Sequence, residues 1–145
     1  MSENHIAEAH LEINAPASRV WEALTDPAQI KQYYFGTDLK TDWKVGSRMT
    51  FTGDWQGKPY EDLGTITAIE PNRRLAYTHW SPLSGTPDTP ENRHQLEFIL
   101  DERDGHTMVT LTQDNNPTED ARDHSAEMWS ALLDDMKQLV ERDTA

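Results

Sequence analysis

Residues 120–142 read DARDHSAEMWSALLDDMKQLVER, and this stretch decides the fold. Its apolar side chains recur at intervals of three and four, which predicts an amphipathic helix. The apolar face comprises Trp129, Leu132, Leu133, Met136 and Val140, and the opposite face comprises Glu127, Asp134, Gln138 and Glu141. A helix of this length spans roughly 30 Å, so its apolar face needs an equally long partner surface. The rest of the sequence is mostly of strand type, and we therefore expect the partner to be a sheet.

The segments before this helix follow in an order that indicates the fold class. Residues 5–13 alternate as a half-buried strand does. Two short helices are predicted over 16–25 and 27–35, separated at Asp26-Pro27 because the residue before proline disfavours helix. The later strand-type segments are 38–42, 48–55, 60–70, 73–80, 93–101 and 106–113. This order predicts one α+β domain over residues 1–145, with an antiparallel sheet curved around the last helix.

Turn signals separate these strands. Asp104-Gly105 is a strong hairpin signal, and Gly64 inside a strand pattern predicts a bulge or a bend. Residues 81–92 hold three Pro and one Gly without periodicity, which predicts a long loop.

Composition narrows the classes of function. The formal charge is −13 and no basic patch is evident, so we predict no nucleic-acid binding. The same charge disfavours adhesion to an anionic membrane. The absence of cysteine excludes disulfides and thiolate chemistry. No apolar run approaches the roughly 18 residues of a membrane span, and the polar N-terminus does not resemble a signal peptide, so we expect a cytoplasmic protein.

Several motifs resemble one family. Residues 15–27, APASRVWEALTDP, resemble the opening of START-like domains, the superfamily of the birch pollen allergen. Residues 33–51, YYFGTDLKTDWKVGSRMTF, resemble the branch related to the C-terminal domain of the activator of the ninety-kilodalton heat-shock-protein ATPase. Further matches are Gly64-Thr65-Ile66, the segment 74–78 (RLAYT) and the segment 129–133 (WSALL). The resemblance covers nearly the whole chain.

This resemblance implies a helix-grip fold: a seven-stranded curved antiparallel sheet that grips the C-terminal helix, with an apolar cavity between them. Relatives that bind ligands hold them in that cavity. The activator has an additional N-terminal domain, for which 145 residues leave no room. We therefore predict binding of a small apolar, aromatic or lipid-like ligand, with no cofactor and no defined catalysis. The alternative is a co-chaperone-like or regulatory protein-interaction module, and a cyclase or hydrolase is a third possibility.

The predicted ligand-binding residues are the large side chains expected on the inner face of the sheet, on the facing side of the last helix and at an entrance. They are Tyr34, Trp43, Phe51, Trp55, Tyr60, Tyr77, His79, Phe98, Leu111, Trp129 and Met136. Walls of this kind suit an apolar ligand, but the same residues would also fill a solid core.

His79 is the one predicted inward imidazole. It could bind the polar group of a ligand, serve as a general base with Tyr77 or Tyr60, or be a hydrogen-bonded core histidine. No carboxylate is adjacent to it in sequence. The other histidines are expected on the surface without metal-ligand spacing, so no metal site is predicted. Glu61-Asp62 is expected at a strand edge and Asp134-Asp135 on a solvated helix face, rather than in acid–base catalysis.

Overall fold

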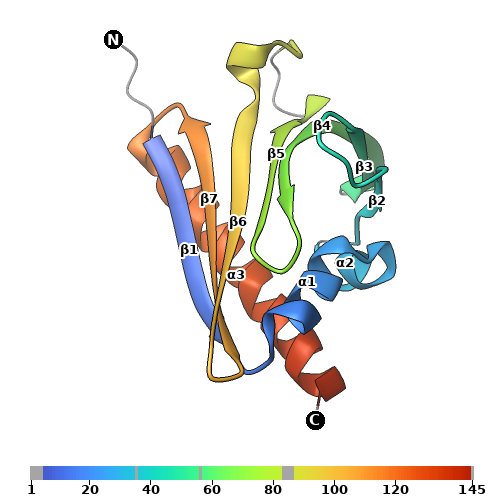
Figure 1. The fold of residues 1–145 in the computed structure, drawn as a ribbon. Coiled ribbons are helices and arrows are strands. Elements are labelled where there is room, and N and C mark those ends of the chain that lie inside the picture. The colour runs from blue at the N-terminus through green and yellow to red at the C-terminus, as the bar shows by residue number, and fades with distance from the viewer. Residues whose placement is uncertain (1–4, 35, 56, 83–86, 145) are drawn as a thin grey trace.

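The computed structural model of the protein describes residues 5–34, 36–55, 57–82 and 87–144, without the side chains of residues 55, 90, 143 and 144. Figure 1 shows the elements in chain order. Their bounds are β1 His5–Ile13, α1 Ala17–Thr25, α2 Pro27–Tyr33, β2 Asp38–Lys40, β3 Arg48–Trp55, β4 Lys58–Glu70, β5 Arg74–Trp80, the 3₁₀ turn η2 Pro90–Asn92, β6 His94–Arg103, β7 His106–Asn116 and α3 Glu119–Thr144.

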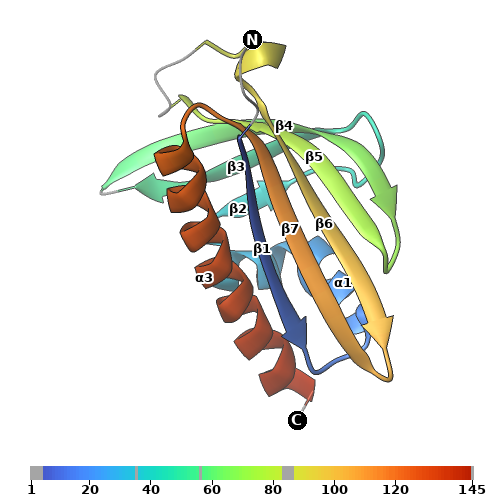
Figure 2. The ribbon, with the colours of Figure 1, turned by 90° about the vertical axis from the view of Figure 1, so that its left-hand side faces the viewer.

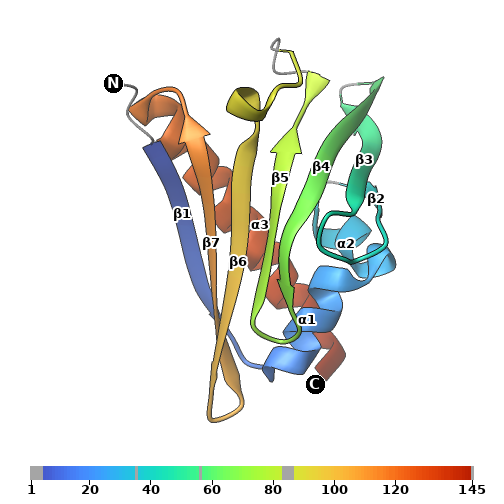
Figure 3. The same ribbon diagram turned by 45° about the horizontal axis from the view of Figure 1, so that its top comes forward.

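The strands form one antiparallel sheet of seven strands in the order β1-β7-β6-β5-β4-β3-β2. The chain therefore meanders from β2 to β7, and β1 pairs with β7 at the other edge (Figure 3). The sheet curves, and α3 runs along its concave side (Figure 2). The predicted α+β class and the helix-grip arrangement, with two short helices after the first strand, are confirmed.

The long helix begins where the sequence provides a cap. The Thr118 hydroxyl oxygen accepts a hydrogen bond from the Ala121 backbone N–H at 3.0 Å, which satisfies one of the free donors of the first turn. Glu119 and Asp120 place negative charge at the positive end of the helix dipole. The predicted apolar face is buried, from Trp129 to Val140, whereas Asp134, Asp135 and Gln138 are exposed.

Local turns fix the register of the meander. At the β6–β7 hairpin Asp104 and Gly105 both have positive φ, 54° and 81°, which a two-residue type I′ turn requires. Of the two alternatives at Gly64, the bulge was wrong, because the register shift between β4 and β5 lies between Ile66 and Ala68. Gly64 instead allows a close approach: a Cβ there would stand 2.3 Å from the Thr78 carbonyl oxygen.

The two short helices close one end of the grip. Asp26 caps α2 by accepting from the Ala28 N–H at 3.1 Å, and Pro27 occupies the first turn, where it needs no donor. The Tyr33 hydroxyl donates to the Ala23 carbonyl at 2.7 Å and ties the two helices together. Both helices contact α3, so the sheet and the C-terminal half of α3 enclose a filled core at this end. None of the described helices has the length and apolar character needed to span a bilayer.

Candidate functional site

A cavity of about 650 Å³ lies at the opposite end, between the sheet and the N-terminal half of α3. This volume is within the usual range of small-molecule sites. Its large side chains are Tyr34, Phe51, Tyr60, Trp80, Met128 and Trp129. Its titratable and amide side chains include Asp62, His79, His94, Gln113, His124 and Glu127. Because His124 and Glu127 are exposed, the cavity opens to the surface beside α3.

Aromatic rings form the deep wall. The Tyr34 ring lies 6.1 Å from the Phe51 ring and 6.0 Å from the Trp129 ring, measured between centroids. Phe51 also meets His79 edge to face at 5.2 Å. The sheet, the end of α2 and α3 thus each contribute one ring, and offset or tilted contacts at these distances are favourable. The wall is therefore held in place before any ligand arrives.

An imidazole and a carboxylate pair inside the cavity. His79 Nε2 lies 3.0 Å from Asp62 Oδ2, and both side chains are mostly buried. The register explains the contact, because Gly64 is opposite His79 and Asp62 lies two residues along β4 on the same face. The carboxylate orients the ring: with Nε2–H donating to Asp62, the Nδ1 of a neutral His79 is an acceptor. The second oxygen, Asp62 Oδ1, is buried and has no hydrogen-bond partner among the described residues.

Two further polar side chains have defined orientations. The indole N–H of Trp129 donates to Gln113 Oε1, so the amide NH₂ of Gln113 is left as a donor. His94 Nδ1 lies 2.9 Å from the Asp114 carbonyl oxygen, which can only accept. His94 therefore carries its proton on Nδ1, and its Nε2 is an acceptor in the neutral ring.

The hydroxyls of Tyr34 and Tyr77 are neutral hydrogen-bonding groups. Burial, together with the negative charge nearby, raises the pKa of Tyr34 well above its usual value, and burial likewise raises the pKa of Tyr77. These two hydroxyls bond to each other. The Tyr60 hydroxyl lies 2.7 Å from the Thr37 hydroxyl. The hydrogen-bond partner of His79 is Asp62.

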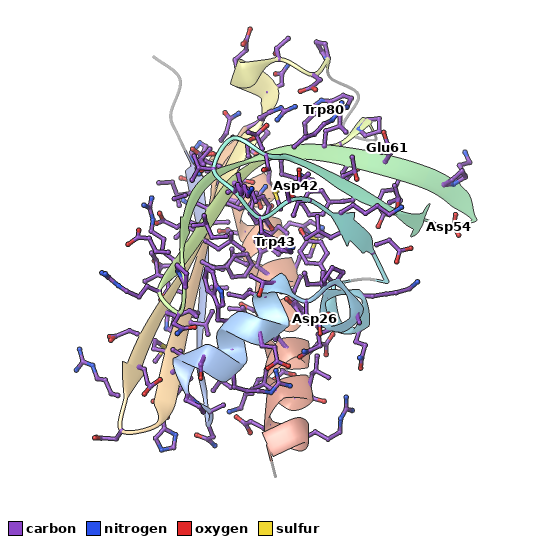
Figure 4. The ribbon with its side chains drawn as sticks, turned by 45° about the vertical axis from the view of Figure 1, so that its right-hand side comes forward. Asp26, Asp42, Trp43, Asp54, Glu61 and Trp80 are labelled. Carbon is purple, nitrogen blue, oxygen red and sulfur yellow. The ribbon has the colours of Figure 1, made fainter. Side chains whose placement is uncertain are left out.

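Only some of the predicted site residues line the cavity. Tyr34, Phe51, Tyr60, His79 and Trp129 line the cavity. Tyr77 and Phe98 border only a void of about 20 Å³ below it, and Leu111 and Met136 are buried in the core. Trp43 is half-buried against the core between β2 and β3 and does not line the cavity (Figure 4). The Trp55 side chain lies outside the described residues.

Sequence reasoning missed Asp62, His94 and Gln113. Asp62 was placed at a strand edge, but β4 lies between β3 and β5, and Asp62 faces inward while Glu61 is exposed. His94 was placed on the surface, but it is partly buried in the cavity wall, directly opposite His79 in the register of β5 and β6. The expected surface position of His124 is correct, although it also borders the cavity mouth. Among the side chains that the structure describes, no group of three or more His, Asp and Glu could hold a metal ion.

A curved sheet gripping a helix, with a ligand-sized cavity between them, defines a START-like helix-grip domain. The chain belongs to the family described as Activator of Hsp90 ATPase homolog 1-like protein, whose model matches residues 14–141. This confirms the family that the sequence motifs predicted.

Solved structures show the same fold. ChR145 from Cytophaga hutchinsonii is 45% identical with a TM-score of 0.84, over 96% of this chain and 95% of that one. The Aha1 dimer from Colwellia psychrerythraea is 22% identical with a TM-score of 0.73, over 94% and 96%. CalU16 from Micromonospora echinospora is 20% identical with a TM-score of 0.72, over 99% and 88%. The last two are similar in fold alone. The comparison with curated proteins gives no match.

Proposed function

We propose that this protein binds a small, largely apolar molecule in the cavity between α3 and the sheet. The observation that carries the proposal is the cavity itself, about 650 Å³ with a fixed wall of aromatic rings. A solid core was the competing expectation, and the same fold does fill the end near α1, apart from a void of about 20 Å³. We also propose that the protein is cytoplasmic, as expected from the sequence.

The polar side chains suit recognition. Ligand sites typically combine apolar walls with a few oriented polar groups. Here the hydrogen bonds of His79, His94 and Gln113 to their neighbours leave one acceptor or donor of each available. Such groups would fix the orientation of a ligand whose body lies against the rings.

A co-chaperone-like role, which the family name suggests, would be favoured by an exposed apolar patch. Among the described residues the large exposed apolar side chains are Ile6, Val45 and Met108. Ile6 lies near the start of β1, Met108 pairs with Glu12 at the other end of β1, and Val45 precedes β3. These side chains do not form a common patch, so the cavity is the better-supported site.

The test is binding of apolar compounds to the purified chain, followed by native mass spectrometry and thermal unfolding. We expect at least one member of a panel of fatty acids, sterols and naphthalene derivatives to bind one to one. A ligand present at 100 times its Kd should stabilise the fold by about 2.7 kcal/mol.

Two tryptophan variants of α3 locate the site. Met128→Trp adds bulk to a half-buried side chain that lines the cavity, and it should weaken binding at least about tenfold. Ser130→Trp introduces the same side chain at an exposed position two residues later and should leave binding intact. A panel with no binder, or equal losses in both variants, would refute the proposal.

A further inference from the structure

The charges in the cavity wall have one sign. Asp62 and Glu127 are the carboxylates among its lining residues, and none of the described lining residues is Lys or Arg. The side chains that can take up a proton there are the imidazoles of His79, His94 and His124. An anionic ligand would therefore meet no permanent positive charge, whereas a cationic ligand would meet two carboxylates.

Asp62 is poorly neutralised for a mostly buried carboxylate. Its Oδ2 pairs with the His79 ring, its side chain is 15% exposed, and its Oδ1 has no partner among the described residues. Charges interact more strongly in such a setting than in water, because the local dielectric constant is lower. A cation beside Asp62 would be attracted and an anion repelled, each more than at the protein surface.

The uncharged polar atoms of the cavity also favour a cationic ligand over an anionic one. His79 Nδ1 and His94 Nε2 are both acceptors once their other nitrogens donate to Asp62 and to the Asp114 carbonyl. The Gln113 amide is a donor, but it carries no net charge. The inner side of the cavity therefore favours a ligand group that donates several hydrogen bonds.

The aromatic wall adds a third attraction. The Tyr34 ring lies 6.1 Å from the Phe51 ring and 6.0 Å from the Trp129 ring, measured between centroids. A cation near a tyrosine or tryptophan face is attracted by the ring quadrupole, by roughly 0.5–2 kcal/mol depending on how far it is desolvated. A carboxylate ligand gains nothing comparable from these faces.

We infer that the ligand is a hydrophobic amine: an ammonium group beside Asp62, with Glu127 contributing at the mouth, on an aromatic or alicyclic body packed against Phe51 and Trp129. This inference rests on the proposed binding function and narrows it to one charge class. Fatty-acid carboxylates are excluded as preferred ligands by the same charges.

The experiment compares three probes that share one ring system: 1-naphthylmethylamine, 1-naphthalenemethanol and 1-naphthoate. Calorimetric or NMR titrations at pH 8, where ordinary imidazole is uncharged, isolate the carboxylates. The amine should bind at least about tenfold more tightly than the alcohol, which corresponds to about 1.4 kcal/mol. Naphthoate should bind most weakly.

Three variants separate the cavity carboxylates from the overall negative charge. Asp62→Asn and Glu127→Gln should each reduce the amine-to-alcohol affinity ratio, with Asp62→Asn reducing it to near one. Glu61→Gln removes the same charge from the adjacent exposed position of β4 and should leave the ratio unchanged. Should Asp62→Asn fail to fold, Glu127→Gln at the exposed mouth still tests the inference.

Each result is decisive. If the alcohol or naphthoate binds as tightly as the amine, the inference is wrong while the binding function stands. If the amine is preferred but Glu61→Gln lowers the ratio as much as the cavity variants do, the attraction comes from overall charge and the inference is also wrong. If no probe binds and the wider panel has no binder either, both proposals fail.

Discussion

Replacing Gly64 by alanine should destabilise the protein far more than a methyl group on a strand normally does. A Cβ at Gly64 would stand 2.3 Å from the backbone carbonyl oxygen of Thr78 and 3.3 Å from the Phe51 ring. Ordinary contact begins at 3.4 Å, and the close atom belongs to the backbone of β5, so it cannot rotate away. β4 and β5 would have to separate locally by about 1 Å.

The expected cost combines opposing terms. Overpacking of this kind costs about 1–3 kcal/mol, and weakening one ladder hydrogen bond adds about 1 kcal/mol. The lower entropy of an unfolded chain with alanine returns about 0.4–1 kcal/mol. The net loss should be about 2–3 kcal/mol, or a fall in Tm of roughly 5–10 °C for a chain of this size.

Urea unfolding followed by circular dichroism measures this loss, with Gly53→Ala as the matched control. A Cβ at Gly53 would meet the Tyr60 hydroxyl at 2.7 Å, which is the end of a side chain rather than backbone. That ring can shift at the expense of its hydrogen bond to Thr37, so the control should cost about 1 kcal/mol. If Gly64→Ala destabilises the protein no more than Gly53→Ala does, the close approach of β4 and β5 does not require glycine at position 64.

Two further changes test other contacts. Trp129→Phe removes the indole donor of Gln113 Oε1 and leaves a buried acceptor unpaired, so it should cost about 1–3 kcal/mol in urea unfolding; a loss below about 0.5 kcal/mol would mean that the bond contributes little. The Asn14 backbone N–H and the Lys137 ammonium hold the pKa of the Glu141 carboxyl below its usual value. A lowered folded pKa stabilises the protein above the ordinary glutamate value of 4.5, and this stabilisation is lost as the pH falls through the folded value. Glu141→Gln should therefore be less stable than wild type near pH 7, by under about 1 kcal/mol at this partly exposed site. The difference in free energy of unfolding should disappear below pH 4.5. A difference that stays constant down to acid pH would contradict this assignment.

Periodicity was sufficient for most of the fold. The bounds expected for β1 and β3 are those observed, and the C-terminal helix is longer than expected by one residue at its start and two at its end. The bulge was misplaced because a glycine inside a strand has two physical uses, a register change or a close backbone approach, and alternation does not distinguish them. Gly64 serves the second use.

The site was harder to predict because it depends on register between strands distant in sequence. Alternation placed Phe51 and His79 on the inner face, as observed. The Asp62–His79 pair, 17 residues apart, follows only from the β4–β5 pairing. Met136 and Leu111 also face inward, yet they lie at the filled end, since alternation says which face a residue takes but not how far the helix stands from the sheet there.

One helix carries both tasks of the domain in separate segments. The turns of α3 from Leu132 to Val140 pack against the sheet, and the turns from His124 to Trp129 border the hollow. Amino-acid changes in the earlier turns can therefore alter which molecules are accommodated while the later turns keep the scaffold intact. This separation lets the fold acquire new ligand specificities through substitutions in a short stretch of sequence, while the protein remains folded at each step.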